Sequence, residues 1–351
     1  MAAPAREPKL DDEPDELDAE ALRVRGAPLP HRLTVPAGND AERLDKALAG
    51  LLPDVSRSRI KQWIEGGAVR LNDRVVAART LVLAGDTIDL APPPAPEETA
   101  FRAEPIALDV VHADESIIVV DKPAGLVVHP AAGNWSGTLL NGLLAYDPSL
   151  ARLPRAGIVH RLDAGTSGLM VVARTAAAQV DLVRQLQARS VTREYWAIVH
   201  GAAAQEGVVE GAIARDPRQP LRFKVSSAAH AKPARTRYRL VDTTEAAGRT
   251  LSWIVCRLDT GRTHQIRVHL ESIGLPLVGD PVYRRGSPSS ASAAGVPWAQ
   301  FTRQALHACR LEIVHPATGQ SMQWFREPPA DMQELMISLG FQWRRGAKGF
   351  R

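Results

Sequence analysis

Residues 156–175 read AGIVHRLDAGTSGLMVVART, a polar loop that runs through a glycine-rich turn into an apolar strand. The polar part is HRLD, residues 160–163, and the turn covers residues 165–168. A carboxylate on a loop before a buried strand is well placed for catalysis, because the scaffold fixes it while ligands reach it from solvent. The plainer interpretation is an aspartate that closes a turn, and spacing alone favours it. Asp163 is therefore a candidate whose case depends on the rest of the chain.

The surrounding segments mix strand and helix patterns. Helical spacing occurs near 136–146, 176–189 and 264–274. Apolar segments with strand character are SIIVVD (116–121), GLMVVA (168–173), YWAIVHG (195–201), RTRYRLVD (235–242) and LSWIVCRLD (251–259). They lack a strict βαβ rhythm, which favours an α+β fold with a mixed, mainly antiparallel sheet over a doubly wound fold. No GxGxxG or Walker-type loop occurs in the sequence, which argues against dinucleotide or nucleoside-triphosphate chemistry.

A separate small α/β segment precedes this region. Ser56 is a suitable N-cap for a helix, SRSRIKQWIEGG, that ends at the glycine pair. The following AVRLNDRVV (68–76) is typical of a hairpin with its turn at Asn72 and Asp73. The Pro-rich APPPAPEET then predicts an extended linker and a domain boundary. The expected organisation is a disordered acidic leader (1–30), a small domain (31–90), a linker (91–100), a catalytic domain (101–330) and a basic C-terminal tail (331–351).

The net charge of +4 conceals an asymmetry. Residues 1–30 carry four basic and eight acidic groups, a net charge of −4, so the remainder carries +8. A mildly basic remainder suits an RNA or DNA partner. The two cysteines, Cys256 and Cys309, are too distant in sequence for a thiolate metal cluster and make a disulfide framework a poor interpretation. No secretory signal or long apolar span is present, and the expected location is the cytoplasm.

Four stretches in order resemble the motifs of the RluA-type pseudouridine synthases, which isomerise uridine in RNA. They are DESIIVVDKPAGLVVHPAAGN (114–134), the HRLD stretch, REYWAIVHG (193–201) and LDTGRTHQIRVHLESIGLPLVGDPVYR (258–284). Segment 31–90 resembles an S4 RNA-binding domain, so the resemblance covers roughly residues 31 to 330. The residues of these motifs are most similar to those of members that modify large-subunit ribosomal RNA. The resemblance implies a pseudouridine synthase fold and a structured RNA partner, and neither metal nor cofactor is required.

The resemblance also implies residue roles. The catalytic aspartate falls on Asp163, the tyrosine beside the target base on Tyr195, and the arginine that pairs with the aspartate on Arg267. Arg161 falls on the arginine that helps to displace the flipped base. A guanidinium would keep the carboxylate ionised, and a tyrosine offers a flat face to uracil and a group that assists loss of the C5 proton.

Two basic patches are candidate RNA contacts. Arg57, Arg59 and Lys61 lie on the second helix of the small segment, where the S4 resemblance favours phosphate contact over a solvated face. Segment 215–239 holds eight basic residues and one acidic residue, and it is as readily a hairpin arm over RNA as a solvated face.

Other interpretations stay open at this point. By itself Tyr195 suits a strand core, and Arg267 a solvated helix face. Ser167, His160 and Asp163 could assemble a hydrolase triad, but no GxSxG elbow occurs in the sequence. His264 and His269 are interpreted as structural, since their spacing does not match helical zinc ligands. At the level of function the rivals are a non-catalytic RNA-binding or ribosome-assembly protein and the same chemistry on transfer RNA. The expected oligomeric state is a monomer.

Overall fold

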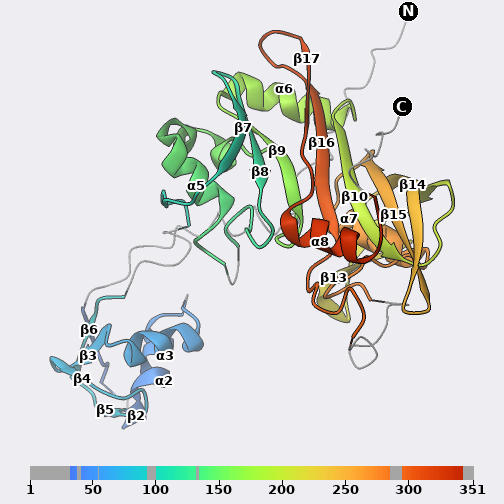
Figure 1. Ribbon diagram of the computed structural model, residues 1–351. Helices are drawn as coiled ribbons and strands as arrows, with labels where there is room; N and C mark the ends of the chain where they lie inside the picture. Colours follow the sequence, from blue (N-terminus) through green and yellow to red (C-terminus); the bar gives the residue numbers. More distant parts are fainter. Residues whose placement is uncertain are drawn as a thin grey trace, which may run out of the picture. The chain divides into compact units, whose positions relative to one another are not determined.

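The computed structural model describes residues 32–37, 41–53, 55–92, 100–131, 134–284 and 295–342. The chain divides into two compact units, Met1–Ala100 and Phe101–Arg351, whose elements are labelled in Figure 1. The predicted leader, residues 93–99 of the predicted linker and residues 343–351 of the predicted tail lie outside the described residues.

The first unit packs two helices on small sheets. Its four-stranded sheet has the order β1-β6-β3-β4, and β2 pairs with β5. The predicted N-cap is confirmed, because the Ser56 side chain accepts a hydrogen bond from the amide of Arg59 at 3.4 Å. The predicted turn is also confirmed, since Asn72 and Asp73 both have positive φ between β3 and β4. The elements are β1 (Arg32–Thr34), β2 (Glu42–Arg43), α2 (Leu44–Leu51), α3 (Arg57–Glu65), β3 (Val69–Leu71), β4 (Arg74–Val75), β5 (Leu81–Val82) and β6 (Thr87–Leu90).

The second unit is built on a nine-stranded sheet. Its order is β11-β14-β15-β10-β16-β9-β8-β7, with β17 beside β16. Only β16 and β9 run parallel among these pairs, so the predicted mixed, mainly antiparallel sheet is confirmed. The strands are β7 (Asp109–Ala113), β8 (Ile117–Lys122), β9 (Ser167–Ala173), β10 (Thr192–His200), β11 (Glu206–Glu210), β14 (Arg235–Ala246), β15 (Arg249–Leu258), β16 (Leu306–Val314) and β17 (Ser321–Phe325).

Helices cover both faces of this sheet (Figure 1). Side chains alternate across β10, so Tyr195 packs with α5 and α7 while Trp196 packs with α8 on the other face. A separate hairpin, β12 and β13, contacts α7. The remaining elements are α5 (Leu139–Tyr146), the 3-10 helices η1 (Pro148–Arg152) and η2 (Pro154–Gly157), α6 (Ala176–Gln187), β12 (Ile213–Asp216), β13 (Gln219–Val225), α7 (Gln265–Ser272) and α8 (Ala330–Ser338).

The C-terminal region differs from the tail expected from residue 331 onward. Residues Ala330–Ser338 form α8, and Met332, Leu335 and Met336 are buried against the sheet. Leu339 and Phe341 continue this contact. The apolar positions follow a helical spacing that covers the Trp196 face, so the packed domain extends past residue 330.

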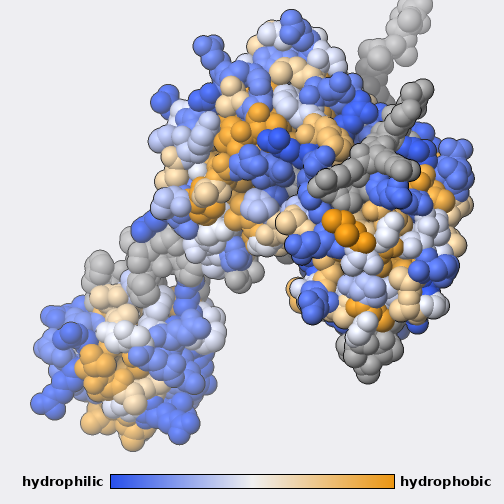
Figure 2. Space-filling model, in the orientation of Figure 1, coloured by the Kyte–Doolittle hydropathy of each residue, from blue (hydrophilic) through white to orange (hydrophobic). Residues whose placement is uncertain are grey.

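The visible face of each unit is mostly hydrophilic, with smaller apolar patches (Figure 2). Among the residues that the structure describes, no helix combines the length and the apolar character that crossing a membrane requires.

Candidate active site

Asp163 lies on the loop between η2 and β9, and the backbone of this loop is closely held. The amide of Thr166 donates to the carbonyl of Asp163 at 3.0 Å and closes the turn. Gly157 and Gly168 flank the loop with φ values of 78° and 118°. A Cβ at Gly157 would lie 1.9 Å from the carbonyl oxygen of Ala173, so only glycine fits there. The glycines of this stretch therefore allow the loop to lie directly against the sheet.

Lys122, at the end of β8, is a residue of the site that the sequence analysis missed. Its side chain is fully buried, and Nζ donates to the carbonyls of Pro123 and Leu126 at 2.8 Å and of Ala164 at 3.1 Å. Burial lowers the pKa of Lys122 to about 7, and the charge of Asp163 acts in the opposite direction. Lys122 thus fastens the residue after Asp163 to the turn after β8. A lysine at the end of the apolar run SIIVVDK is the signal that could have identified it.

Arg267 on α7 contacts Asp163, so the structure brings together the pair that the resemblance implied. Its Nη1 donates to Oδ2 of Asp163 at 3.0 Å. Its Nε and Nη2 donate to the two oxygens of Asp280 at 2.7 and 2.9 Å, and the ring of Tyr283 lies 4.9 Å from the guanidinium carbon. The side chains of Arg267 and Asp280 are 5% and 0% exposed. One buried cation is therefore shared between two carboxylates, and Asp280 and Tyr283 were not predicted.

The environment keeps Asp163 ionised. Its side chain is 19% exposed, and burial acts to raise its pKa. The neighbouring His264, Arg267 and Arg161 outweigh burial, so the pKa of Asp163 lies below its ordinary value. The carboxylate of Asp163 is therefore negatively charged throughout the neutral pH range.

Tyr195 lies on β10, beside a β-bulge in the pairing with β16. Its side chain is buried on the sheet face that carries Leu162 and Ile266, the neighbours of Asp163 and Arg267 in sequence. Burial raises the pKa of Tyr195 to about 12, and the charge of Asp163 raises it further. The hydroxyl therefore stays protonated near neutral pH, so it assists loss of the C5 proton as a hydrogen-bonding group and not as a phenolate base.

His264, which was interpreted as structural, lies at the site instead. Its Nε2 is 3.9 Å from Oδ1 of Asp163, and its Nδ1 is 2.9 Å from the hydroxyl of Tyr283. The residue adopts a left-handed backbone with φ of 55° at the N-cap of α7. Strained non-glycine residues are concentrated at functional sites. His269, by contrast, is fully buried with both ring nitrogens hydrogen-bonded, as a structural role requires.

Arg161 is exposed on the same loop as Asp163. Its charge lowers the pKa of Asp163. Burial, with smaller contributions from Arg155 and Arg161, lowers the pKa of His129 to about 3. The guanidinium of Arg161 is therefore close enough to Asp163 to influence it electrostatically while it remains open to solvent.

The hydrolase interpretation does not match the geometry. The hydroxyl of Ser167 is 3.0 Å from Nδ1 of His307, and Nε2 of His160 accepts from the amide of Val171 at 3.0 Å. Burial lowers the pKa of His160 to about 3. Because each group has a different partner, Ser167, His160 and Asp163 do not form a catalytic triad.

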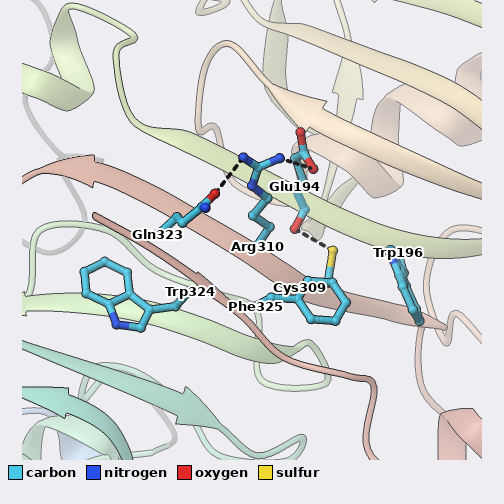
Figure 3. A pocket seen from close by; sticks show the side chains of 7 residues that line it. All are labelled: Glu194, Trp196, Cys309, Arg310, Gln323, Trp324 and Phe325. Carbon is cyan, nitrogen blue, oxygen red and sulfur yellow. Dashed lines mark hydrogen bonds and ion pairs between the residues drawn. The ribbon is translucent and has the colours of Figure 1, made fainter. Parts of the chain in front are cut away.

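A pocket on the opposite face of the sheet is distinct from this site (Figure 3). Within it Arg310 lies 3.8 Å from Glu194 and donates to Gln323 at 2.9 Å. It is lined by Glu194, Trp196, Cys309, Arg310, Gln323, Trp324 and Phe325. Trp196 and Cys309 of this pocket belong to the core on the α8 side of the sheet, whereas Tyr195 belongs to the core on the other side.

The predicted basic residues of the small unit all lie on α3, whose apolar side chains are buried in the core of the unit. Arg57 is 54% exposed, yet its guanidinium also donates to the buried carboxylate of Asp45 at 2.9 Å. Lys61 lies 3.6 Å from Glu65, and both side chains are largely exposed. Arg57 thus supports the unit itself, whereas Lys61 is the freer candidate for a phosphate contact.

The predicted arm within 215–239 contains the hairpin of β12 and β13. Arg222 of this hairpin forms an ion pair with Glu271 and lies 5.2 Å from the ring of Tyr283. The amide of Phe223 donates to the hydroxyl of the same tyrosine at 2.9 Å. Through Tyr283 the hairpin is therefore connected to His264 and Arg267, the neighbours of Asp163.

Comparisons with known proteins match both units. The family described as RNA pseudouridylate synthase matches residues 116–272, and the S4 domain family matches residues 42–88. A Nitrosomonas europaea protein named ribosomal large subunit pseudouridine synthase D is 48% identical over 307 residues, which cover 88% of this chain and 87% of that protein. The Escherichia coli (strain K12) protein of the same name is 46% identical over 86% of this chain and 92% of its own.

A solved structure is similar as well. Human RNA pseudouridylate synthase domain containing 1 superposes with a TM-score of 0.50 at 25% identity, covering 65% of this chain and 86% of its own. Asp163, Tyr195 and Arg267 all lie within the matched residues 116–272.

Proposed function

The chain belongs to the RNA pseudouridylate synthase family, and on that premise we propose that it isomerises uridines of large-subunit ribosomal RNA with Asp163 as its catalytic carboxylate. The observation that carries this proposal is the ionised Asp163, held by Arg267 in a site that also contains Tyr195 on the adjoining sheet face. A partly buried carboxylate whose pKa is lowered by several cationic side chains is typical of functional sites, which favours a catalytic role over RNA binding alone.

The chemistry requires an anion at this point. Isomerisation breaks the bond between C1′ of the ribose and N1 of uracil, turns the base, and joins C5 to C1′ with loss of the C5 proton. A carboxylate stabilises or traps the electron-deficient C1′. Arg267 orients Asp163 through one nitrogen because Asp280 fixes the other two. The aromatic face of Tyr195 supports the uracil.

RNA access defines the remaining parts of the proposal. A uridine inside a helix must leave the stack to reach Asp163, and the exposed Arg161 is suited to fill the space that it leaves. The S4 unit supplies phosphate contacts through Arg57, Arg59 and Lys61. The proposed location is the cytoplasm, because a bacterial enzyme meets its ribosomal substrate there. The proposed oligomeric state is a monomer.

Mapping pseudouridines in cellular RNA from strains with and without the gene tests the substrate. The expected result is the loss of specific pseudouridines in large-subunit ribosomal RNA and their return on complementation. Loss confined to transfer RNA would contradict the ribosomal assignment, and an unchanged map would contradict the activity itself.

Removing the S4 unit is expected to weaken binding and leave the chemistry in place. A protein that begins at Phe101 retains the whole second unit, so it is expected to fold and keep weak activity. Each lost phosphate contact reduces the slope of log K against log salt by about 0.7–0.9. Filter binding between about 50 and 200 mM salt measures this slope. Equal affinity and slope for both proteins would contradict the role of the unit.

The matched test in the full chain is the double substitution Arg59→Gln with Lys61→Gln. Arg57 is left intact because its removal would strip a partner from the buried Asp45. The slope is expected to fall by about 1–2 if both residues contact phosphates. An unchanged slope would restrict the RNA contacts to other parts of the chain.

Tyr195→Phe is expected to separate stacking from proton transfer. Phenylalanine keeps the aromatic face and removes the hydroxyl, so bond rearrangement should survive better than the final loss of the C5 proton. Tritium release from C5 reports deprotonation, and nucleoside analysis of the same RNA reports rearrangement. An unchanged overall rate would leave Tyr195 with a packing role only.

A further inference from the structure

His264 faces the carboxylate without bonding to it. The 3.9 Å between its Nε2 and Oδ1 of Asp163 is too long for a hydrogen bond. Its side chain is 22% exposed, so part of the imidazole is open to solvent. The backbone of His264 is left-handed, at φ of 55°, a conformation that is strained for a residue other than glycine. The fold therefore holds an imidazole in a strained position beside Asp163.

The hydrogen bonds around Tyr283 determine the tautomer of His264. The hydroxyl of Tyr283 accepts from the amide of Phe223 at 2.9 Å and lies 2.9 Å from Nδ1 of His264. Within the described part of the chain, Nδ1 of His264 is the acceptor for the proton of this buried hydroxyl. The hydroxyl therefore donates to Nδ1, and the neutral imidazole carries its proton on Nε2, directed toward Asp163.

Packing fixes the direction of this N–H. The His264 ring meets the rings of Phe223 and Tyr283 edge to face, with centroids 5.6 Å apart in both pairs. Tyr283 is itself held by the guanidinium of Arg267, 4.9 Å from its ring. Burial lowers the pKa of His264, which keeps the ring neutral. The result is a pre-positioned donor beside Asp163.

We propose that His264 is a further catalytic residue, whose Nε2–H donates a hydrogen bond to O2 of the target uracil as the glycosidic bond breaks. This inference rests on the proposed function of Asp163. The C1′–N1 bond breaks, and its electron pair passes into the uracil ring, where the charge spreads over N1 and the carbonyl oxygens. O2 is attached to the carbon next to N1, so it lies beside C1′ when Asp163 faces that atom. His264 donates a hydrogen bond and transfers no proton; the C5 proton is lost later, after C5 bonds to C1′.

The test uses full-length protein and in vitro transcribed large-subunit ribosomal RNA with tritium at C5 of uridine. His264→Phe keeps a planar ring against Phe223 and Tyr283 and removes the donor. Removing one such donor is expected to lower kcat by about 10²-fold, with KM for the RNA nearly unchanged. His264→Gln places an amide donor near the position of Nε2, so it is expected to recover about tenfold of this loss.

A second substrate separates catalysis from structural support. Fluorine at C5 withdraws electrons and stabilises the uracil anion, so RNA made with 5-fluorouridine needs the donor less. Consumption of 5-fluorouridine, measured by nuclease digestion and chromatography, is expected to fall by about tenfold in His264→Phe instead of about 10²-fold. His264→Asn, which tolerates the left-handed backbone, is expected to behave like His264→Phe, because its amide is too short to reach O2.

Each outcome decides the proposal. An equal loss of rate on both RNAs, or a loss that lies in KM alone, would overturn it and leave His264 a structural residue. Folding of His264→Asn, checked by urea unfolding, ensures that the comparison is made on native protein. Failure of the proposed function is distinguishable, because wild-type protein would then form no pseudouridine on any RNA tested.

Discussion

Asp163→Asn is expected to give a folded protein that binds RNA and forms no detectable pseudouridine, a loss of more than about 10³-fold. Asparagine is nearly isosteric with aspartate but carries no negative charge for the reacting C1′. Arg267 keeps its two hydrogen bonds to Asp280, so the loss of its contact with Asp163 is expected to lower the free energy of unfolding by only about 1–2 kcal/mol. Pseudouridine content after a single-turnover incubation measures the effect.

The control for this substitution is binding. RNA affinity of Asp163→Asn, measured at the same salt as for wild type, is expected to be unchanged, because the proposed phosphate contacts are made by other residues. A folded Asp163→Asn protein that isomerised uridine at close to the wild-type rate would show that this carboxylate is not the catalytic group.

Asp280→Asn is expected to cause the largest loss of stability, about 3–5 kcal/mol. Asp280 is completely buried, and its carboxylate accepts two hydrogen bonds from Arg267 and further ones from the amides of Val282 and Tyr283. A neutral amide leaves the buried guanidinium with Asp163 alone and turns an NH2 group toward it. Urea unfolding measures the change, and activity is expected to fall with it because Arg267 loses the partner that orients it.

A matched pair exists in which the carboxylate is exposed. Arg303 also contacts both oxygens of a carboxylate, Asp331, at 2.7 and 2.8 Å, but the Asp331 side chain is 49% exposed. Asp331→Asn is therefore expected to cost less than about 1 kcal/mol. Similar losses for the two substitutions would show that burial of the Arg267–Asp280 pair does not contribute the expected stabilisation.

Local signals were sufficient for much of the fold. The N-cap at Ser56 and the turn at Asn72 and Asp73 depend on hydrogen bonds and backbone angles that a few neighbouring residues set. The strand segments depended on continuous apolar runs, which sheet burial on both faces requires. By contrast, α8 was missed because the basic residues after it made the whole segment 331–351 resemble a solvated tail. Its apolar side chains pack on the sheet face that carries Trp196, and this contact exists only in the tertiary structure.

From the sequence alone, the residues around Asp163 were identified only through the motif resemblance. It named Tyr195, Arg267 and Arg161. It did not reveal Lys122, Asp280, Tyr283 or the position of His264, because contacts such as that between Asp163 and Arg267 join residues 104 positions apart. A buried lysine or aspartate is identified by the charges and carbonyls that surround it, and these come from different elements of the sheet. Local backbone conformation is determined by residues that are neighbours in sequence. The pKa, the tautomer and the orientation of a catalytic group are set by partners that only the tertiary structure brings within hydrogen-bonding distance.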